Sequence, residues 1–386
     1  MTAPAEVERV ARAARAGGRM GLDTEFMREK TYRARLCLVQ VAWGDEVALI
    51  DAHKGGDVKA LADVVADPQV ETIVHAGRQD LDILHDRFGT VPGHVFDVQV
   101  AAGFLGHGSS LPYGRLVAGV LGVSLVKGES YTDWCRRPLT AAQLSYAEAD
   151  VRYLLPLADR LQRDLARRGR TEWFRAEMQP LESAESYGND PREAWRRVPG
   201  RGTLSARQAA VLRELAAWRE QTAAARDLPR GWLVKDPTLV EIARRRPASL
   251  RELKGIRGLN AREADRSADA ILAAVAAGAQ APALEQRDEA WPREAVARAR
   301  VLGGPADAIA RARCDAAGIA VELVVTRGET EALLAEHFAG RLDESRHRVL
   351  RGWRRDLVGE HLLALADGAI AVRAIDSPPY VEEVRL

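Results

Sequence analysis

Three strand-like segments follow one another near the N-terminus, at residues 19–26, 35–43 and 46–51. Apolar residues alternate with others in the second segment, as in a half-buried strand, and Gly44 supplies a hairpin turn before the third. Helical and strand-like stretches then alternate, and a long helical stretch covers residues 140–168. Strands joined by hairpins and followed by alternating strands and helices predict a mixed β-sheet with helices packed on it.

Two carboxylates lie on the first of these strands. Asp23 and Glu25 are two residues apart, so both side chains project from the same face of the strand. Asp80 stands near the start of a predicted helix. Tyr146 and Asp150 are four residues apart and share one face of a later helix. We expect these five side chains to converge on one site.

Such a set of oxygen ligands is typical of a two-metal phosphodiesterase. Two divalent ions about 3.5–4 Å apart stabilise charge on the attacking and leaving oxygens, and Mg²⁺ needs only a few carboxylates because it keeps several waters. Asp23 could bridge both ions while Glu25 and Asp150 complete one site. Asp80 would support the other ion, directly or through water. Tyr146, whose ordinary pKa is near 10, would orient the attacking water, and repulsion among the four acids should raise at least one pKa in the absence of metal.

Each of these signals has a structural alternative. An acid pair at this spacing is commonly a solvated strand end, and Tyr146 with Asp150 is commonly a buried ring beside a surface charge. Asp82 and Asp86 lie close to Asp80 and could take its role. The order of the motifs within one α/β domain favours a metal-dependent phosphoryl-transfer site.

The composition is that of a globular protein with more than one domain. The 386 residues carry a formal net charge of +1, so a nucleic-acid surface must be a local basic patch. Cys37, Cys135 and Cys314 are far apart, which indicates neither a disulfide framework nor a zinc site and is typical of a reducing cytosol. No signal-peptide core and no apolar run of about 18 residues is present, so we expect a cytoplasmic protein without a membrane span.

Prolines and turn residues divide the chain. Pro180, Pro191 and Pro199 lie in a stretch without periodic pattern, which we interpret as a linker at residues 181–202. The remaining domains are expected to be an α/β domain at 1–180, an all-helical domain at 203–280 and a second helical domain at 281–386, in which residues 319–326 look like a strand.

Four stretches around the acids carry a family signature: Leu22–Phe26, His75–Gly77 with Asp80–Leu81, Thr132–Trp134 with Arg137–Thr140, and Tyr146–Pro156. In these motifs, residues 19–170 resemble the DEDD superfamily of 3′→5′ exonucleases and, within it, the ribonuclease D family. The tyrosine four residues before the last aspartate marks the DEDDy subgroup. The resemblance implies an RNase H-like fold, with the four acids as ligands of two Mg²⁺ or Mn²⁺ ions and Tyr146 positioning water. It also implies release of 5′-mononucleotides from RNA 3′ ends, with tRNA precursors as substrates.

The first helical domain resembles the helicase-and-RNase-D C-terminal (HRDC) domain. The basis is LVKDPTL at residues 233–239 and LKGIRGL at 253–259. The glycines of the second stretch allow a tight turn into a helix whose free N–H groups can meet a phosphate. Arg244, Lys254 and Arg257 would add a salt-sensitive affinity for RNA. The alternative is an ordinary helix–turn–helix connection with solvated arginines. The second helical domain stands where the family has another HRDC copy, from which it diverges.

Three further residues are candidates for substrate contact. Phe26 points away from the acids on a regular strand, but a bent strand end could lay its ring against the terminal base. The alternative is a core residue. His75 could touch a phosphate or a ribose hydroxyl, or be a structural histidine. Lys127 could meet the substrate phosphate.

The sequence thus predicts a 3′→5′ exoribonuclease with an RNase H-like domain followed by HRDC-type helical domains. One alternative is a DNA 3′→5′ exonuclease for proofreading or repair, because the same acids serve both substrates. The other is a non-catalytic RNA-binding adaptor, which would lack one or more of the acids.

Overall fold

The N-terminal domain is built on a five-stranded mixed sheet, as the sequence predicts. We analysed a computed structural model, which describes residues 3–53, 57–125, 132–188, 190–284 and 291–386. The strand order is β3-β2-β1-β4-β5, with β1, β2 and β3 antiparallel and β1, β4 and β5 parallel. The strands are β1 (Arg19–Met27), β2 (Arg35–Trp43), β3 (Glu46–Asp51), β4 (Glu71–Val74) and β5 (Val95–Asp97).

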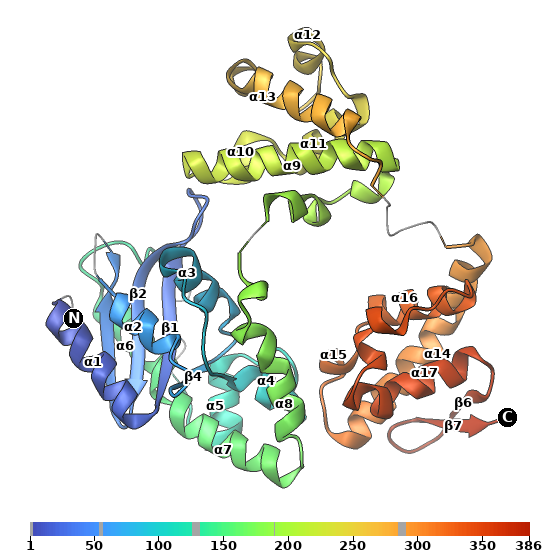
Figure 1. Cartoon of the computed structure of the whole chain (residues 1–386). Helices are drawn as coiled ribbons and strands as arrows, with labels where there is room; N and C mark the ends of the chain where they lie inside the picture. Colours follow the sequence, from blue (N-terminus) through green and yellow to red (C-terminus); the bar gives the residue numbers. More distant parts are fainter. Residues whose placement is uncertain (1–2, 54–56, 126–131, 189, 285–290) are drawn as a thin grey trace.

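Helices cover the sheet (Figure 1). Along β1, Met20, Leu22 and Thr24 are buried, and Asp23 and Glu25 alternate with them, which is the two-residue period of a strand. Thr140 caps α6 through a reciprocal pair of hydrogen bonds with Gln143, so that helix begins at a fixed residue over β2 and β3. The helices of this domain are α1 (Pro4–Gly17), α2 (Lys59–Val65), α3 (Arg78–Phe88), α4 (Val98–Phe104), α5 (Tyr113–Leu121), α6 (Ala141–Arg152), α7 (Leu154–Arg167) and α8 (Thr171–Met178).

The second unit is helical and has its own core. The predicted linker contributes to it: Trp195 and Val198, on and next to the 3₁₀ helix Pro191–Arg197, are buried with Leu215 and Ile271. This segment is therefore ordered against the helices that follow it, while the division of the chain into domains stays a prediction. The helices are α9 (Ala206–Arg226), α10 (Arg230–Leu233), α11 (Asp236–Arg245), α12 (Leu250–Lys254) and α13 (Ala261–Gln280).

The third unit corrects one prediction. Residues 319–326, expected as a strand, contain the one-turn helix α15 (Val321–Val324), because Val324 is buried in the core and Thr326 immediately caps the next helix. Near the C-terminus lies a two-stranded hairpin that the sequence analysis did not predict. The other elements are α14 (Arg293–Ala317), α16 (Arg327–Phe338), a π-helical turn (Arg355–Gly359), α17 (Glu360–Ala366), β6 (Ile370–Ala374) and β7 (Val381–Arg385).

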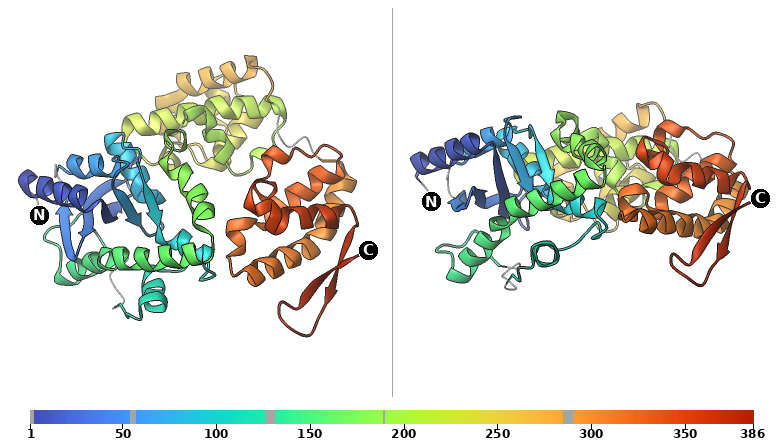
Figure 2. Two further views of the ribbon diagram at one scale, coloured as in Figure 1. Left: turned by 60° about the horizontal axis from the view of Figure 1, so that its bottom comes forward. Right: turned by 90° about the horizontal axis from the view of Figure 1, so that it is seen from below.

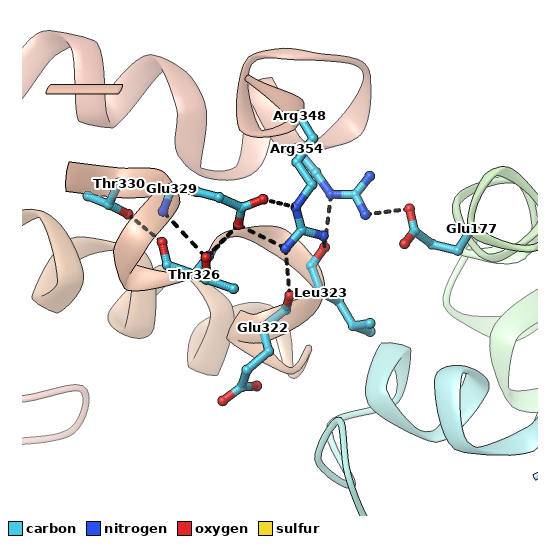
Figure 3. A network of polar contacts seen from close by, with 8 residues as sticks. All are labelled: Glu177, Glu322, Leu323, Thr326, Glu329, Thr330, Arg348 and Arg354. Carbon is cyan, nitrogen blue, oxygen red and sulfur yellow. Dashed lines mark hydrogen bonds and ion pairs between the residues drawn. The ribbon is translucent and has the colours of Figure 1, made fainter. Parts of the chain in front are cut away.

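The third unit packs back on the first, so the three units form a ring (Figures 1 and 2). The Trp353 ring stacks on Trp173 at a centroid distance of 4.8 Å and meets the edge of Phe104 at 5.4 Å. Figure 3 shows Arg354 donating to the Leu323 carbonyl at 2.8 Å and pairing with Glu177 of α8. Aromatic packing and a partly buried ion pair thus hold this contact.

A disulfide joins Cys37 of β2 to Cys135, which contradicts the prediction that the cysteines are unpaired. The two residues are 98 positions apart in the sequence, so their proximity depends on how the loop before α6 returns to the sheet. No helix in the described part of the chain is long and apolar enough to cross a bilayer.

Candidate active site

Three of the predicted acids meet at the end of the sheet. Asp23 and Glu25 come from β1 and Asp150 from α6, and one carboxylate oxygen of each lies within 4.8 Å of the others. The antiparallel register places Asp23 opposite Gln40 on β2, directly beneath α6. Segments far apart in the sequence therefore bring these oxygens to one point.

Asp80 belongs to the same group. It is 7% exposed, accepts a hydrogen bond from the Thr24 hydroxyl, and its charge raises the pKa of Asp23. Its two neighbours in sequence have other surroundings: Asp82 pairs with Arg78 at 3.1 Å, and Asp86 lines a separate cavity. Asp80 is thus the acid of α3 that faces the site. We call Asp23, Glu25, Asp80 and Asp150 the acid cluster.

A turn before α3 fixes the position of Asp80. The buried Asp97 carboxylate accepts hydrogen bonds from the backbone N–H groups of Ala76 at 3.1 Å and Gly77 at 3.0 Å. Ala76 has a φ of 54°, and a Cβ on Gly77 would lie 2.4 Å from the Val74 side chain. The sequence analysis missed Asp97, although its position at the end of a strand beside β4 was a usable signal.

Tyr146 lies beside the acid cluster. Its phenol hydrogen-bonds the Asp150 carboxylate, and its ring lies 6.0 Å from that of Trp134. The loop carrying Trp134 is held to the sheet by Arg137, whose guanidinium makes two bonds to Asp51, at 2.5 and 2.6 Å. This pair lowers the pKa of Asp51 below its ordinary value.

Burial and mutual repulsion make the acid cluster hard to ionise fully. The pKa of Glu25 rises to about 8 because of burial and then the charges of Asp150 and Asp80. Burial is the largest cause for the other members too: it raises the pKa of Asp80 and that of Asp150 to about 6. The pKa of Asp23 is raised well above its ordinary value by burial and by its three acidic neighbours. The predicted rise of at least one pKa is confirmed.

The acid cluster fits divalent cations chemically. Its ligands are carboxylate oxygens, which Mg²⁺ and Mn²⁺ prefer, and cations would offset the repulsion that adds to burial in raising the pKa values of Asp23 and Glu25. The sulfurs of Cys37 and Cys135 also lie within 4.8 Å of a ring nitrogen of His53. They are bonded to each other, however, and a disulfide offers no thiolate to a metal.

Phe26 lines a cleft together with Glu25. The register of β1 against β2 shifts between these two residues, so the regular alternation that would separate their side chains is broken. The cleft has a volume of about 870 Å³ and extends to Thr132 and Trp134. The strand is therefore irregular after Glu25, while Phe26 is also partly buried against the main core, as the alternative of a core residue expects.

The side chain of His75 contacts other residues of the same domain. Its Nε2 lies 3.0 Å from the Leu111 carbonyl oxygen, its ring meets that of Tyr113 at 5.4 Å, and burial lowers its pKa. Tyr113, which the sequence analysis missed, is close enough to Asp150 and Asp23 for their charges to add to the effect of burial in raising its pKa. Nothing in the sequence around Tyr113 signals this position.

The remaining predicted contacts differ in their surroundings. Lys127 lies outside the described residues. Arg244 pairs with Glu241 at 2.9 Å, and Lys254 pairs with Asp265. Arg257 is exposed at the turn before α13. These three basic residues lie on the second unit, away from the acid cluster.

Gln40 is a further residue that the sequence analysis did not single out. Both polar atoms of its fully buried side chain lack a hydrogen-bond partner in the described part of the chain. Gln40 lies opposite Asp23 across the β1–β2 pair. A polar residue in an otherwise apolar strand was the signal available in the sequence.

Comparisons with known proteins identify the families to which the domains of this chain are similar. The 3′-5′ exonuclease domain family matches residues 1–166, and the HRDC domain family matches residues 208–275. Ribonuclease D of Gluconacetobacter diazotrophicus is 38% identical over 90% of this chain and 88% of its own length. Ribonuclease D of a Jannaschia species is 35% identical over 94% of both chains.

A solved structure extends the agreement to the whole fold. The crystal structure of Escherichia coli RNase D, described as an exoribonuclease involved in structured RNA processing, superposes with a TM-score of 0.79 at 31% identity. The superposition covers 95% of this chain and 98% of the Escherichia coli chain. The mixed sheet and the helical units after it are both covered by this comparison. The chain therefore belongs to the ribonuclease D family of 3′–5′ exoribonucleases.

Proposed function

We propose that the acid cluster holds two divalent cations, Mg²⁺ or Mn²⁺, at the 3′ end of an RNA. The observation that carries this proposal is the approach of the Asp23, Glu25 and Asp150 oxygens to within 4.8 Å of one another, with Asp80 beside them. Asp23 has all three other acids as neighbours, so it would be the ligand that both cations have in common. Bound cations would act as Lewis acids on the phosphodiester and neutralise charge on the attacking and leaving oxygens.

Tyr146 positions the attacking water. Its phenol already hydrogen-bonds Asp150, so a water held between them would be oriented toward the phosphorus. The water oxygen forms a bond to phosphorus, and the bond from phosphorus to the 3′ oxygen of the preceding nucleotide breaks. A proton passes to that 3′ oxygen, and the products are a 5′-mononucleotide and an RNA shortened by one nucleotide.

Phe26 stacks on the terminal base, which contributes about 1–3 kcal/mol without sequence preference. His75 would have to release the Leu111 carbonyl to touch a phosphate or a ribose hydroxyl, and Lys127 is proposed from the sequence to meet a phosphate. On the second unit, Arg257 is exposed for a phosphate contact. Arg244 and Lys254 would exchange their present carboxylate partners for RNA, so their contribution should weaken with salt.

The substrates are structured RNAs with a single-stranded 3′ end, and precursors of tRNA are the proposed class. The Escherichia coli relative is described as acting in structured RNA processing, which supports this choice. A cytoplasmic location follows from such substrates.

The proposal is tested with an RNA labelled at its 5′ end and incubated with the protein and Mg²⁺. The wild type should produce a ladder shortened one nucleotide at a time, and Asp23→Asn and Asp150→Asn should each lose at least about a thousandfold in rate. A DNA of the same sequence is the control for substrate class, because the 2′-hydroxyl is the main local difference. Internal products, or a fully active Asp23→Asn variant, would contradict the proposal.

A further inference from the structure

Two cavities meet at the N-terminal end of β2, beside Arg35. The first is the cleft of about 870 Å³ that begins at Glu25 and Phe26. The second, of about 500 Å³, lies between the β2 end and α3 and is lined by Arg33, Arg87 and Asp86, among others. Both are lined by Arg35 and His53, so these two side chains connect the catalytic cleft to the second cavity.

The second cavity is strongly basic. Three arginines, Arg33, Arg35 and Arg87, face one carboxylate, Asp86. Arg33 and Arg35 are exposed, and in the described part of the chain neither has the kind of ion-pair partner that occupies Arg244. The cleft next to it is balanced in charge, because Glu25, Glu29 and Asp133 are matched there by Arg28, Lys30 and Arg35. A basic cavity adjoining it suits the phosphates that stay outside the acid cluster.

The second unit holds the loop at the mouth of this cavity. The Tyr32 hydroxyl donates to Glu220 of α9 at 2.8 Å, and the backbone N–H groups of Tyr32 and Arg33 donate to Asp227 at 3.1 and 3.4 Å. Figure 1 shows this loop reaching from β1 and β2 to α9 and α10. The loop is therefore held by the sheet where it leaves β1 and enters β2, and by the second unit at Tyr32 and Arg33. These contacts limit the conformational freedom of the backbone at Arg33.

We infer that the RNA strand leaves the active site through this basic cavity, so that the phosphates on the 5′ side of the scissile bond bind Arg35, Arg33 and Arg87. The inference rests on the proposed function, since it takes the terminal nucleotide to lie at Glu25 and Phe26. His53 stands at the junction, where it contacts the strand as it passes from the cleft to the cavity. The path continues toward the HRDC unit, which adds contacts for longer RNAs.

The inference predicts a dependence on RNA length. A dinucleotide reaches only the acid cluster and Phe26, whereas an oligonucleotide of about 12 nucleotides, within the usual site size of single-strand binding proteins, also occupies the basic cavity. The test uses the full chain with the double variant R33E/R35E. The matched control is R12E/R163E, which makes the same change in charge at two exposed arginines of the same domain outside both cavities.

Affinity is measured by fluorescence anisotropy in EDTA, and turnover of the dinucleotide is measured with Mg²⁺. R33E/R35E should weaken binding of the longer RNA at least about tenfold, because charged hydrogen bonds are lost, and should flatten its salt dependence. Turnover of the dinucleotide is measured on R33E alone, because Arg35 also lines the catalytic cleft whereas Arg33 lines only the second cavity, and it should equal that of the wild type. R33K/R35K, which keeps the charge, should regain most of the affinity.

Three results would overturn the path. They are unchanged affinity of R33E/R35E for the longer RNA, an equal loss of affinity in R12E/R163E, and a loss of dinucleotide turnover in R33E. If the wild type shortened no RNA, the proposed function would fail, and the anisotropy comparison would still decide the path.

Discussion

Glu25 has a pKa of about 8 because burial and the charges of Asp150 and Asp80 disfavour its ionised form. In the unfolded chain a glutamate has a pKa near 4.5. Between these values the folded state holds a proton that the unfolded state has lost, so stability falls as pH rises through this window. The pKa values of Asp80 and Asp150 are each raised to about 6, so their ionisation also lowers the stability of the folded state as pH rises toward 6.

We therefore expect the melting temperature of the metal-free protein to fall between about pH 5 and pH 8. Glu25→Gln should remove part of this fall, since a neutral amide cannot ionise. Mg²⁺ should restore stability at pH 8, because it binds only the folded state. Thermal melts in EDTA and in Mg²⁺ check this. A metal-free melting temperature that rises steadily with pH would contradict it.

Tyr146 contributes orientation rather than binding in this account. Tyr146→Phe removes the hydroxyl that hydrogen-bonds Asp150 and keeps the ring against Trp134. We expect kcat to fall by about ten- to a hundredfold, at the low end of general acid–base effects, with KM nearly constant. Steady-state kinetics on one labelled RNA separate the two parameters. A rise in KM at constant kcat would instead assign Tyr146 to substrate binding.

At the scale of elements, the strand–turn–helix unit from β4 to α3 is the most constrained part of the site. Asp97 accepts the N–H groups of Ala76 and Gly77, and Gly77 has no room for a side chain beside Val74. Gly77→Ala should destabilise the protein by about 1–3 kcal/mol through overpacking and should displace Asp80. Urea unfolding measures the loss, with Gly89→Asn, at an exposed left-handed helix end, as the control.

The sequence predicted the elements whose signals are local. The alternation of apolar residues predicted the strands β1 to β3, and the order of Asp23, Asp80 and Asp150 predicted which acids make up the site. Both patterns can be read from the sequence without knowing any tertiary contact. Comparison with ribonuclease D relatives confirms the fold class and the family.

The features that could not be predicted from the sequence depend on contacts between segments that are far apart in the chain. The register shift after Glu25 reflects how β1 meets β2, and the anchoring of the turn by Asp97 depends on the pairing of β4 with β5. The Cys37–Cys135 disulfide arises from the return of a loop to the sheet. Residues 319–326 have the composition of a strand, but they pair with no strand in the described part of the chain, and Val321–Val324 form a helical turn instead.

At the scale of the whole molecule, the ring closes where Trp353 meets Trp173 and Phe104. Trp353→Ala should release the third unit from the first and raise the radius of gyration measured by small-angle X-ray scattering. Turnover of a dinucleotide should stay unchanged, because no residue of the acid cluster is touched. Trp232→Ala is the matched control, since that ring is 60% exposed and lies on α10 of the second unit. An unchanged radius for Trp353→Ala would show that other contacts, such as Arg354 with Glu177, suffice for closure.

The central claim is that the acid cluster takes up divalent cations to do its chemistry. Isothermal titration of the metal-free protein with Mn²⁺ tests it most directly, repeated in two buffers of different ionisation enthalpy at about pH 7, where several of the acids still hold protons. The account predicts about two ions per chain, release of protons on binding, and loss of this binding in Asp23→Asn. Absence of binding in the wild type, or the same binding in Asp23→Asn, would contradict it.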